Sequence, residues 1–163
     1  AIIALDKSIA RQNAAPENLF DKAVVLMTPT RKKNKALINK VSKFWKSLKC
    51  QVKSISPQLH DLVLSETSHL PHLVSFALVN IILNTKSIKN IKDYTGGGFR
   101  DFARLAHSDA LMWNDICMSN NQNIISSINM LIKELSLIKT MVESNDKSLR
   151  LYLNRIKTKL DKK

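Results

Sequence analysis

Apolar residues recur at helical spacing along most of the chain. Between residues 122 and 142 they lie at Ile124, Ile128, Leu131, Leu135, Ile138 and Val142, and between 147 and 160 at Leu149, Leu153, Ile156 and Leu160. Steps of four and three align such residues on one side of a helix, so both segments are predicted to be helices with an apolar seam. The segment 71–84 is apolar at nearly every position, which predicts a helix buried on all sides. Shorter helices are predicted at 57–67, 99–107 and 108–118.

The first third of the chain has a different pattern. Lys22–Thr28 is a compact, β-branched run that predicts a buried strand, and Gln51–Ser56 predicts a second short strand. Between them, residues 31–49 form an amphipathic helix, which Thr28-Pro29-Thr30 is predicted to cap. A strand–helix–strand segment is the end of an α/β layer and cannot form a sheet of its own. The predicted fold class is mainly α, with residues 1–56 and 57–163 as two domains.

Positive charge is concentrated in the amphipathic helix and its surroundings. The chain of 163 residues has a net charge of +13, and no acidic residue lies between Lys22 and His60. The basic residues of this block are Arg31, Lys32, Lys33, Lys35, Lys40, Lys43, Lys46, Lys49 and Lys53. Clustered lysines can contact phosphates, which suggests a nucleic-acid-binding module. However, Phe44 and Trp45 lie on or near the apolar face and no nucleic-acid motif is present, so a solvated lysine face is favoured over a nucleic-acid partner.

Targeting and redox signals point to a cytoplasmic protein. No apolar run approaches the roughly 18 residues needed to span a bilayer, because 73–83 is short and interrupted by Ser75 and Asn80. No leader sequence with a cleavage site is found at the start, and no membrane contact is expected. Cys50 and Cys117 are too few and too far apart for a metal signature, so both are predicted to be reduced thiols and no metal is expected.

Two polar islands interrupt the apolar pattern, at 68–72 and 96–104. In the first, His69 and His72 are three residues apart and would be neighbours on a helix. In the second, all three glycines of the chain precede a helix that carries Arg100, Asp101 and Arg104. Guanidinium forks suit carboxylates and imidazoles are donors near neutral pH, so these residues predict an anion site. The alternatives are a capped helix junction begun by Ser68 and a flexible surface turn followed by a salt-bridged helix.

Five short motifs occur in a recognisable order. They are His60-Asp61, Ser68-His69-Leu70-Pro71-His72-Leu73, Gly97-Gly98-Phe99-Arg100-Asp101-Phe102-Ala103-Arg104, Ser108-Asp109 and Met112-Trp113-Asn114-Asp115-Ile116. Together they resemble the C-terminal domain of prephenate dehydrogenases, including the arogenate and cyclohexadienyl dehydrogenases of tyrosine biosynthesis. The resemblance extends from about Leu19 to Val142. It implies a helical dimerisation domain preceded by the remnant of a Rossmann-type domain, with a homodimer formed through helices 71–84 and 122–160.

The resemblance also implies a reaction and a substrate site. These enzymes oxidise the ring C4 alcohol of prephenate, pass hydride to NAD or NADP, and release carbon dioxide to give 4-hydroxyphenylpyruvate. By motif match, Arg104 would bind a substrate carboxylate and His72 would line the pocket, while Asp101 and Gly97 would shape its wall. Trp113 would lie close behind. Further candidates are His69, Arg100 and His60.

Several parts of such an enzyme are missing from this sequence. The family's catalytic histidine would lie just before Ala1, and Ala1, Ala4 and Ile9 stand where the family has proline and glycines. No Gly-x-Gly-x-x-Gly is present, so NAD or NADP would be bound mainly by a domain outside these residues. We therefore expect the C-terminal part of a larger prephenate or arogenate dehydrogenase, inactive by itself. The alternatives are a non-catalytic dimerisation scaffold and, less favoured, the nucleic-acid module.

Overall fold

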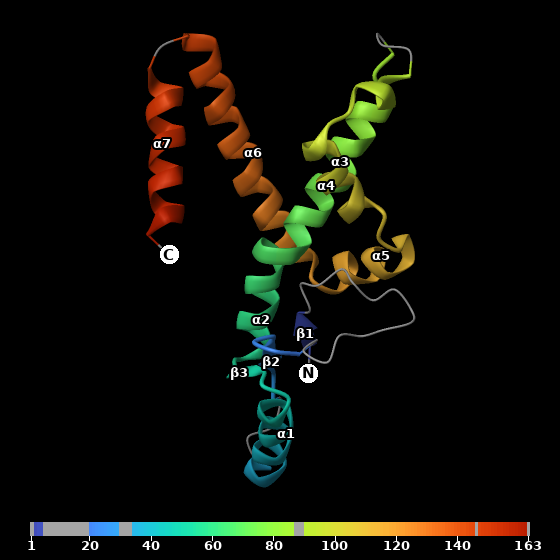
Figure 1. Ribbon diagram of the computed structural model, residues 1–163, viewed down its shortest axis with the longest axis vertical. Helices are drawn as coiled ribbons and strands as arrows, with labels where there is room; N and C mark the ends of the chain where they lie inside the picture. The colour runs from blue at the N-terminus through green and yellow to red at the C-terminus, as the bar shows by residue number, and fades with distance from the viewer. Residues whose placement is uncertain (1, 5–19, 30–33, 87–89, 146, 163) are drawn as a thin grey trace. The chain divides into compact units, whose positions relative to one another are not determined.

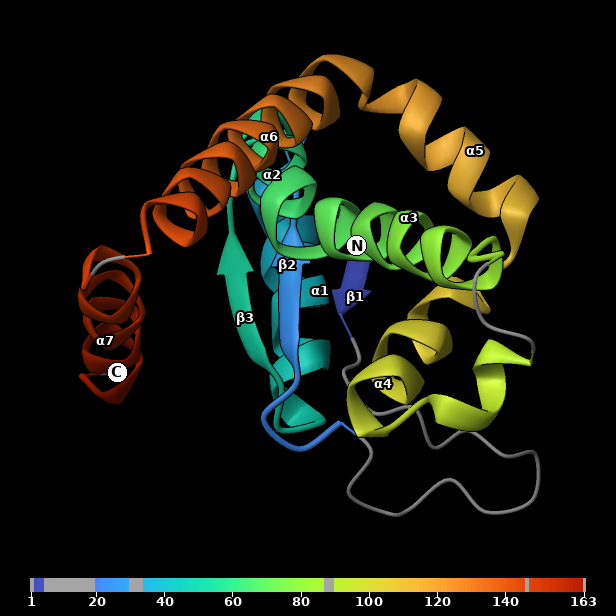
Figure 2. The ribbon, with the colours of Figure 1, turned by 90° about the horizontal axis from the view of Figure 1, so that it is seen from above.

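The computed structural model describes residues 2–4, 20–29, 34–86, 90–145 and 147–162 (Figures 1 and 2). The chain divides into two compact units, Ala1–Leu64 and Ser65–Lys163, and each is described by itself. The predicted domain boundary at residue 56 stays a prediction. The mainly α fold class, with a short β-α-β segment ahead of the helices, is confirmed.

The first unit contains a three-stranded sheet in the order β1-β2-β3, so the expectation that this segment cannot form a sheet of its own is wrong. β2 (Val24–Met27) runs parallel to β3 (Gln51–Ser54), and α1 (Lys35–Ser47) connects them, which confirms the predicted strand–helix–strand segment. β1 (Ile2–Ala4) pairs antiparallel to β2 and was not predicted, because three residues are too few to show a period. α2 (Pro57–Leu64) ends the unit.

The core of this unit is apolar and lies between the sheet and α1. Val25 and Met27 of β2 are buried with Cys50, because alternate residues of a strand face the same side. Trp45 of α1 packs against this cluster and makes edge contacts with the rings of Phe20 and Phe44. Figure 2 shows α1 covering one face of β2 and β3.

Two features of α1 differ from the prediction or extend it. The capping residue is Asn34, whose side-chain oxygen accepts a hydrogen bond from the Leu37 backbone N–H at 3.0 Å. The predicted cap at Thr28-Pro29-Thr30 is wrong, because the helix begins after Asn34 and leaves Pro29 outside it. The described lysines of the basic block are exposed, and the Lys49 ammonium lies 3.5 Å from the Asp21 carboxylate.

The second unit is entirely helical in its described residues. Its elements are η1 (Ser65–His69), α3 (Leu70–Leu83), η2 (Ile91–Tyr94), α4 (Gly97–Ala106), α5 (Ala110–Ser119), α6 (Asn121–Ser144) and α7 (Ser148–Asp161). α4 packs along α3, and α6 and α7 form an antiparallel pair (Figure 1). The five helices predicted between residues 71 and 160 are confirmed in kind, with η2 added inside a predicted polar connection. The sixth predicted helix, 57–67, corresponds mainly to α2 of the first unit.

The first polar island, 68–72, spans the end of the π-helical turn η1 and the start of α3 and is not a junction between two separate helices. The helix continues from Pro57 to Leu83, and His69 has helical dihedral angles (φ −70°, ψ −47°) without a side-chain cap. The alternative of a capped junction at Ser68 is therefore wrong. Pro71 supplies a local cause, since its ring would meet the carbonyl of the residue four positions earlier in a straight α-helix. π-turns of this kind occur frequently at functional sites.

This continuous helix changes the expectation about membranes. Its 27 residues are long and apolar enough to cross a bilayer by length and composition, so the statement that no segment reaches that length is wrong. The sequence pattern does not show this length, because the polar residues of the first island separate two apolar segments. The core helix of a soluble protein passes the same test, and Ser65, His69 and Ser75 within this helix are buried polar residues.

Apolar side chains of the second unit are largely uncovered in a single chain. The prediction that α3 is buried on all sides is wrong for one copy, because Ile81 is 65% exposed and Ser75 is its one buried residue. Leu135 and Val142 of α6 and Leu153 and Leu160 of α7 are also more than half exposed. Such apolar surface is typical of a face that binds another protein surface.

Candidate functional site

His72 of α3 stacks on Trp113 of α5. Their ring centroids are 4.1 Å apart and the ring planes are inclined by 26°. His72 Nδ1 lies 2.9 Å from the backbone carbonyl oxygen of Ser68 in the π-turn. A carbonyl can only accept, so Nδ1 carries a proton, and the Nε2 atom of the neutral ring is an acceptor. The stack and the hydrogen bond together fix both the position and the tautomer of this imidazole.

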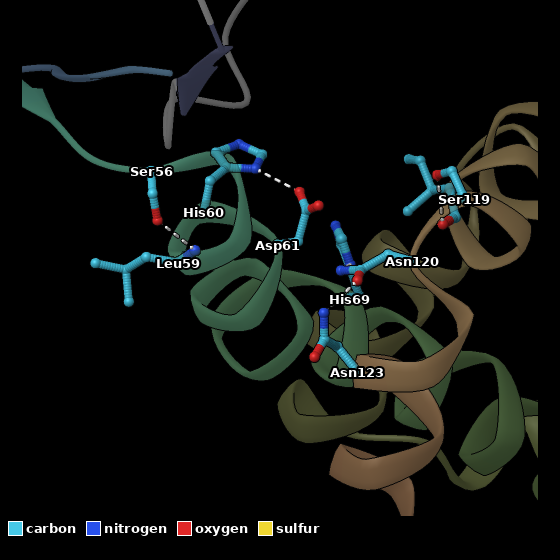
Figure 3. A network of polar contacts seen from close by, with 9 residues as sticks. Ser56, Leu59, His60, Asp61, His69, Ser119, Asn120 and Asn123 are labelled. Atoms are coloured by element: carbon cyan, nitrogen blue, oxygen red, sulfur yellow. Dashed lines mark hydrogen bonds and ion pairs between the residues drawn. The ribbon is translucent and has the colours of Figure 1, made fainter. Parts of the chain in front are cut away.

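His69, one helical turn earlier, meets the same indole edge-on. Its ring centroid is 6.0 Å from that of Trp113 at 81°, and the residue is 9% exposed. His69 Nδ1 lies 3.4 Å from the amide nitrogen of Asn120, the residue before α6. The side-chain oxygen of Asn120 in turn accepts a hydrogen bond of 2.8 Å from the side-chain amide nitrogen of Asn123 (Figure 3). The sequence singled out His69 but neither asparagine, because asparagine is abundant in this chain and carries no spacing signal.

The π-turn is attached to α6 by a second polar contact. The hydroxyls of Ser65 and Ser127 are 3.1 Å apart, and both residues are almost completely buried. The Ser127 hydroxyl also donates to the Asn123 backbone carbonyl at 3.0 Å, within its own helix. The small side chains of the two serines let η1 and α6 approach closely, and their hydroxyls provide each other with a hydrogen-bond partner. The histidines are therefore held on a rigid base.

Trp113 carries a polar group that lacks a partner. The residue is 7% exposed, and its Nε1 is buried without a hydrogen-bond acceptor among the described residues. Leaving a buried donor unpaired costs about 1–3 kcal/mol, so such groups call for an explanation. Trp113 therefore combines contacts to two imidazole rings with a buried donor that no described residue accepts.

The residues predicted on the second island gather on α4. Gly96 precedes the helix and Gly97 and Gly98 form its first turn, and none of the three has positive φ. A Cβ placed at Gly97 would meet nothing nearer than the Arg100 guanidinium, at 3.9 Å. Arg100, Asp101 and Arg104 are exposed, and within the described chain Asp101 pairs with neither arginine. The alternative of a salt-bridged surface helix is therefore wrong.

The exposed arginines give α4 the character of an anion-binding element. Two guanidinium groups one turn apart lie on a helix whose amino end, at Gly97, presents unsatisfied backbone N–H groups. Of the predicted site residues, the structure brings His69, His72 and Trp113 together. Gly97, Arg100, Asp101 and Arg104 form a second group on α4.

The remaining histidine candidate lies in the first unit. His60 on α2 is 7% exposed, and its Nδ1 donates to the Asp61 carboxylate at 2.9 Å (Figure 3). Its Nε2 is buried and has no hydrogen-bond partner among the described residues. This carboxylate contact on Nδ1 orients the His60 ring. The contact explains why the sequence places an aspartate directly after this histidine.

Other reactive groups are limited in the part of the chain that the structure describes. No group of three or more His, Cys, Asp or Glu side chains there is arranged to hold a metal ion. Cys50 and Cys117 are free thiols. Burial raises the pKa of the Cys117 thiol, which disfavours the reactive thiolate at neutral pH.

Comparison with known proteins identifies similar chains. Residues 56–156 match the family described as prephenate dehydrogenase, dimerization domain. The chain is 34% identical over 134 residues to a prephenate dehydrogenase of Bacillus subtilis, and 30% identical over 130 residues to a cyclohexadienyl dehydrogenase of Zymomonas mobilis. These matches include 82% and 78% of the chain, but it spans only 36% and 44% of the two relatives' lengths.

A solved structure shows the same similarity in three dimensions. The prephenate dehydrogenase from A. aeolicus, in complex with hydroxyphenyl propionate and NAD+, superimposes with a TM-score of 0.80 and is 38% identical in sequence. The match covers 89% of this chain and 51% of that protein.

Proposed function

The chain belongs to the prephenate dehydrogenase family through its dimerization domain, and from this premise we propose that it binds substrate and dimerises as part of an NAD(P)-dependent prephenate or arogenate dehydrogenase. The observation that supports substrate binding most directly is the His72–Trp113 stack with an unpaired, buried indole N–H beside it. Two of the family motifs, far apart in the sequence, meet there.

The proposed site combines a flat, aromatic wall with cationic groups. Trp113 donates a hydrogen bond to a substrate oxygen, and the neutral His72 ring offers Nε2 as an acceptor. Arg104, with Arg100 one turn away, binds a carboxylate through its planar guanidinium fork, and Asp101 and Gly97 shape the adjoining wall. His69 supports the indole from its edge. This division of roles suits a ring-bearing substrate with carboxylate groups, such as prephenate.

Enclosing such a substrate requires more surface than one chain provides. Arg100 and Arg104 are exposed, and a guanidinium binds a carboxylate more strongly once water is excluded. The additional walls have two available sources, a second copy of the dimerization domain and the half or more of the relatives' length that these residues do not match. The site is therefore proposed as one part of a larger pocket.

The hydride acceptor is proposed to lie outside these residues. A similar protein binds NAD+, but the three consecutive glycines here do not have the spacing of a dinucleotide-binding loop. When bound, the cofactor accepts a hydride from the substrate alcohol, while this chain's residues hold the ring and the carboxylate in place. NAD-dependent turnover of prephenate by residues 1–163 alone would contradict this division.

The substrate site is tested by Arg104→Ala in the protein expressed from its complete natural reading frame. Removing a charge-assisted hydrogen bond to a carboxylate costs about 1.5–3 kcal/mol, so we expect prephenate to bind about 10–100-fold more weakly by calorimetry. Arg104→Lys keeps the charge but loses the fork, and an intermediate affinity is expected. The matched control is Arg150→Ala, which removes another exposed arginine, from α7.

A second candidate function is a dimerisation scaffold without substrate binding. The exposed apolar faces of α3, α6 and α7 favour dimerisation whether or not a substrate binds. The differences from the family at Ala4, and at Ala1 and Ile9, which lie outside the described residues, agree with lost chemistry. Unchanged prephenate affinity in Arg104→Ala would favour the scaffold. The nucleic-acid module stays an untested alternative.

A further inference from the structure

A chain of polar contacts leads from α6 to the Nδ1 atom of the His69 imidazole. Asn123 donates to Asn120, and the Asn120 amide nitrogen lies 3.4 Å from His69 Nδ1. We propose that Asn120 is a positioning residue that fixes the tautomer of His69, and that Asn123 sets the direction of the Asn120 amide. The significance of this device for substrate binding rests on the proposed function.

The direction of the chain follows from which atoms can donate. An amide nitrogen can only donate, so His69 Nδ1 must accept, and the proton of the neutral ring is on Nε2. Asn120 has only two polar ends. Because its oxygen is engaged by the Asn123 amide at 2.8 Å, its nitrogen is the end that faces His69.

Burial makes this direction significant. Asn120 is 8% exposed and His69 is 9% exposed, so bulk water cannot readily replace a mismatched contact. A mismatched buried donor or acceptor costs about 1–3 kcal/mol, which is enough to favour one tautomer about 5- to 150-fold. The neighbouring His72 has the opposite tautomer, because its Nδ1 carries the proton that Ser68 accepts. His69 and His72 both contact Trp113, but their different hydrogen-bond partners favour different tautomers of the two neutral rings.

The arrangement can be reversed with single-atom changes. In Asn120→Asp, a carboxylate faces His69 and can only accept, so the proton of the neutral ring moves to Nδ1. In Asn123→Asp, the donor to the Asn120 oxygen is lost, and the amide turns over so that its nitrogen meets the new carboxylate. The Asn120 oxygen then faces His69 and again requires a proton on Nδ1. The second variant transmits the change through an unaltered Asn120.

The test is a measurement of imidazole nitrogen shifts by NMR in the ¹⁵N-histidine-labelled protein, at a pH where the ring is neutral. His69→Gln assigns the signal. We expect the Nε2–H form in the wild type and the Nδ1–H form in Asn120→Asp and in Asn123→Asp. Asn129→Asp adds the same charge at an exposed position of α6 and should leave the tautomer unchanged. If Asn120→Asp fails to fold, the tautomer of His69 in Asn123→Asp tests the proposal, because position 123 is less buried.

An unchanged tautomer in a folded Asn123→Asp would overturn the proposal, as would a wild-type ring already protonated on Nδ1. The tautomer is read without substrate, so it does not depend on the proposed function. A switched tautomer with unchanged prephenate affinity would uphold the positioning role and count against His69 in substrate binding. Failure of the Arg104→Ala test, by contrast, leaves the tautomer prediction unaffected.

Discussion

In the first unit, Ala1–Leu64, the most buried side chains are mainly apolar, whereas in the second, Ser65–Lys163, most of them are polar. Val25, Met27 and Cys50 form an ordinary core beneath α1. The second unit buries Ser65, His69, Ser75, Asn120 and Ser127, with Trp113, Ile124 and Tyr152, while many of its leucines and isoleucines are exposed. The first unit therefore contains its own core. In the second unit, polar side chains are buried and hydrogen-bonded to one another, but much of the apolar surface is exposed, as expected for a dimerization domain.

The largest expected effect comes from placing charge on the uncovered apolar faces. Ile81→Lys on α3 or Leu135→Lys on α6 would bury an unpaired ammonium group in the dimer at a cost of several kcal/mol. We expect the dimer dissociation constant to rise at least about 100-fold by sedimentation velocity over a concentration series. Asn129→Lys is the control, since it adds the same charge to α6 at an exposed polar position. Wild-type dimerisation in both variants would mean that these faces serve another purpose.

A smaller effect is expected from the core of the first unit. Val25 is completely buried, so Val25→Ala leaves a small cavity and should lower the free energy of unfolding by about 2 kcal/mol. Chemical denaturation measures this loss, and the monomer–dimer equilibrium should not change. We expect the loss of unfolding free energy in Val25→Ala to be the same at every protein concentration. The stability of the second unit, by contrast, should rise with protein concentration, because dimerisation stabilises its folded state. A shift in the dimer equilibrium would show that the two units depend on one another.

The smallest effect concerns the pair of helices α6 and α7. The Tyr152 hydroxyl donates to the Glu134 carboxylate, and this hydrogen bond, with burial and the nearby negative charge, raises the pKa of Tyr152. The folded-state pKa then lies above the unfolded value of about 10, so the contribution is present below pH 10 and lost as pH rises through the folded value.

Thermal unfolding between pH 8 and pH 11 measures this effect. The wild type should lose more stability over that range than Tyr152→Phe, which has no group to titrate there. Glu134→Gln removes the carboxylate, so it should also lose less stability between pH 8 and pH 11 than the wild type does. Parallel pH profiles in all three proteins would show that the hydrogen bond does not persist in solution.

The elements of this protein are largely readable from its sequence because each depends on local spacing. The apolar seams at steps of four and three predicted α6 and α7, and the β-branched run 22–28 predicted β2. The π-turn could not be predicted, because Ser68, Pro71 and two histidines are equally consistent with a helix start. The structure instead continues the helix and widens it ahead of the proline.

The candidate site shows the same limit. Residue type and order singled out His69, His72 and Trp113, but the stacking of His72 on an indole 41 positions further on is a property of the fold. Asn120, Asn123, Ser65 and Ser127 were missed, since short polar side chains look like ordinary surface residues until a neighbouring helix buries them. The sequence by itself determined the helices and the family motifs, because these depend on spacing and composition along one chain. Which hydrogen bonds form, which tautomer each imidazole adopts and which apolar faces remain uncovered were decided only by the tertiary structure, because these depend on partners brought together from distant segments.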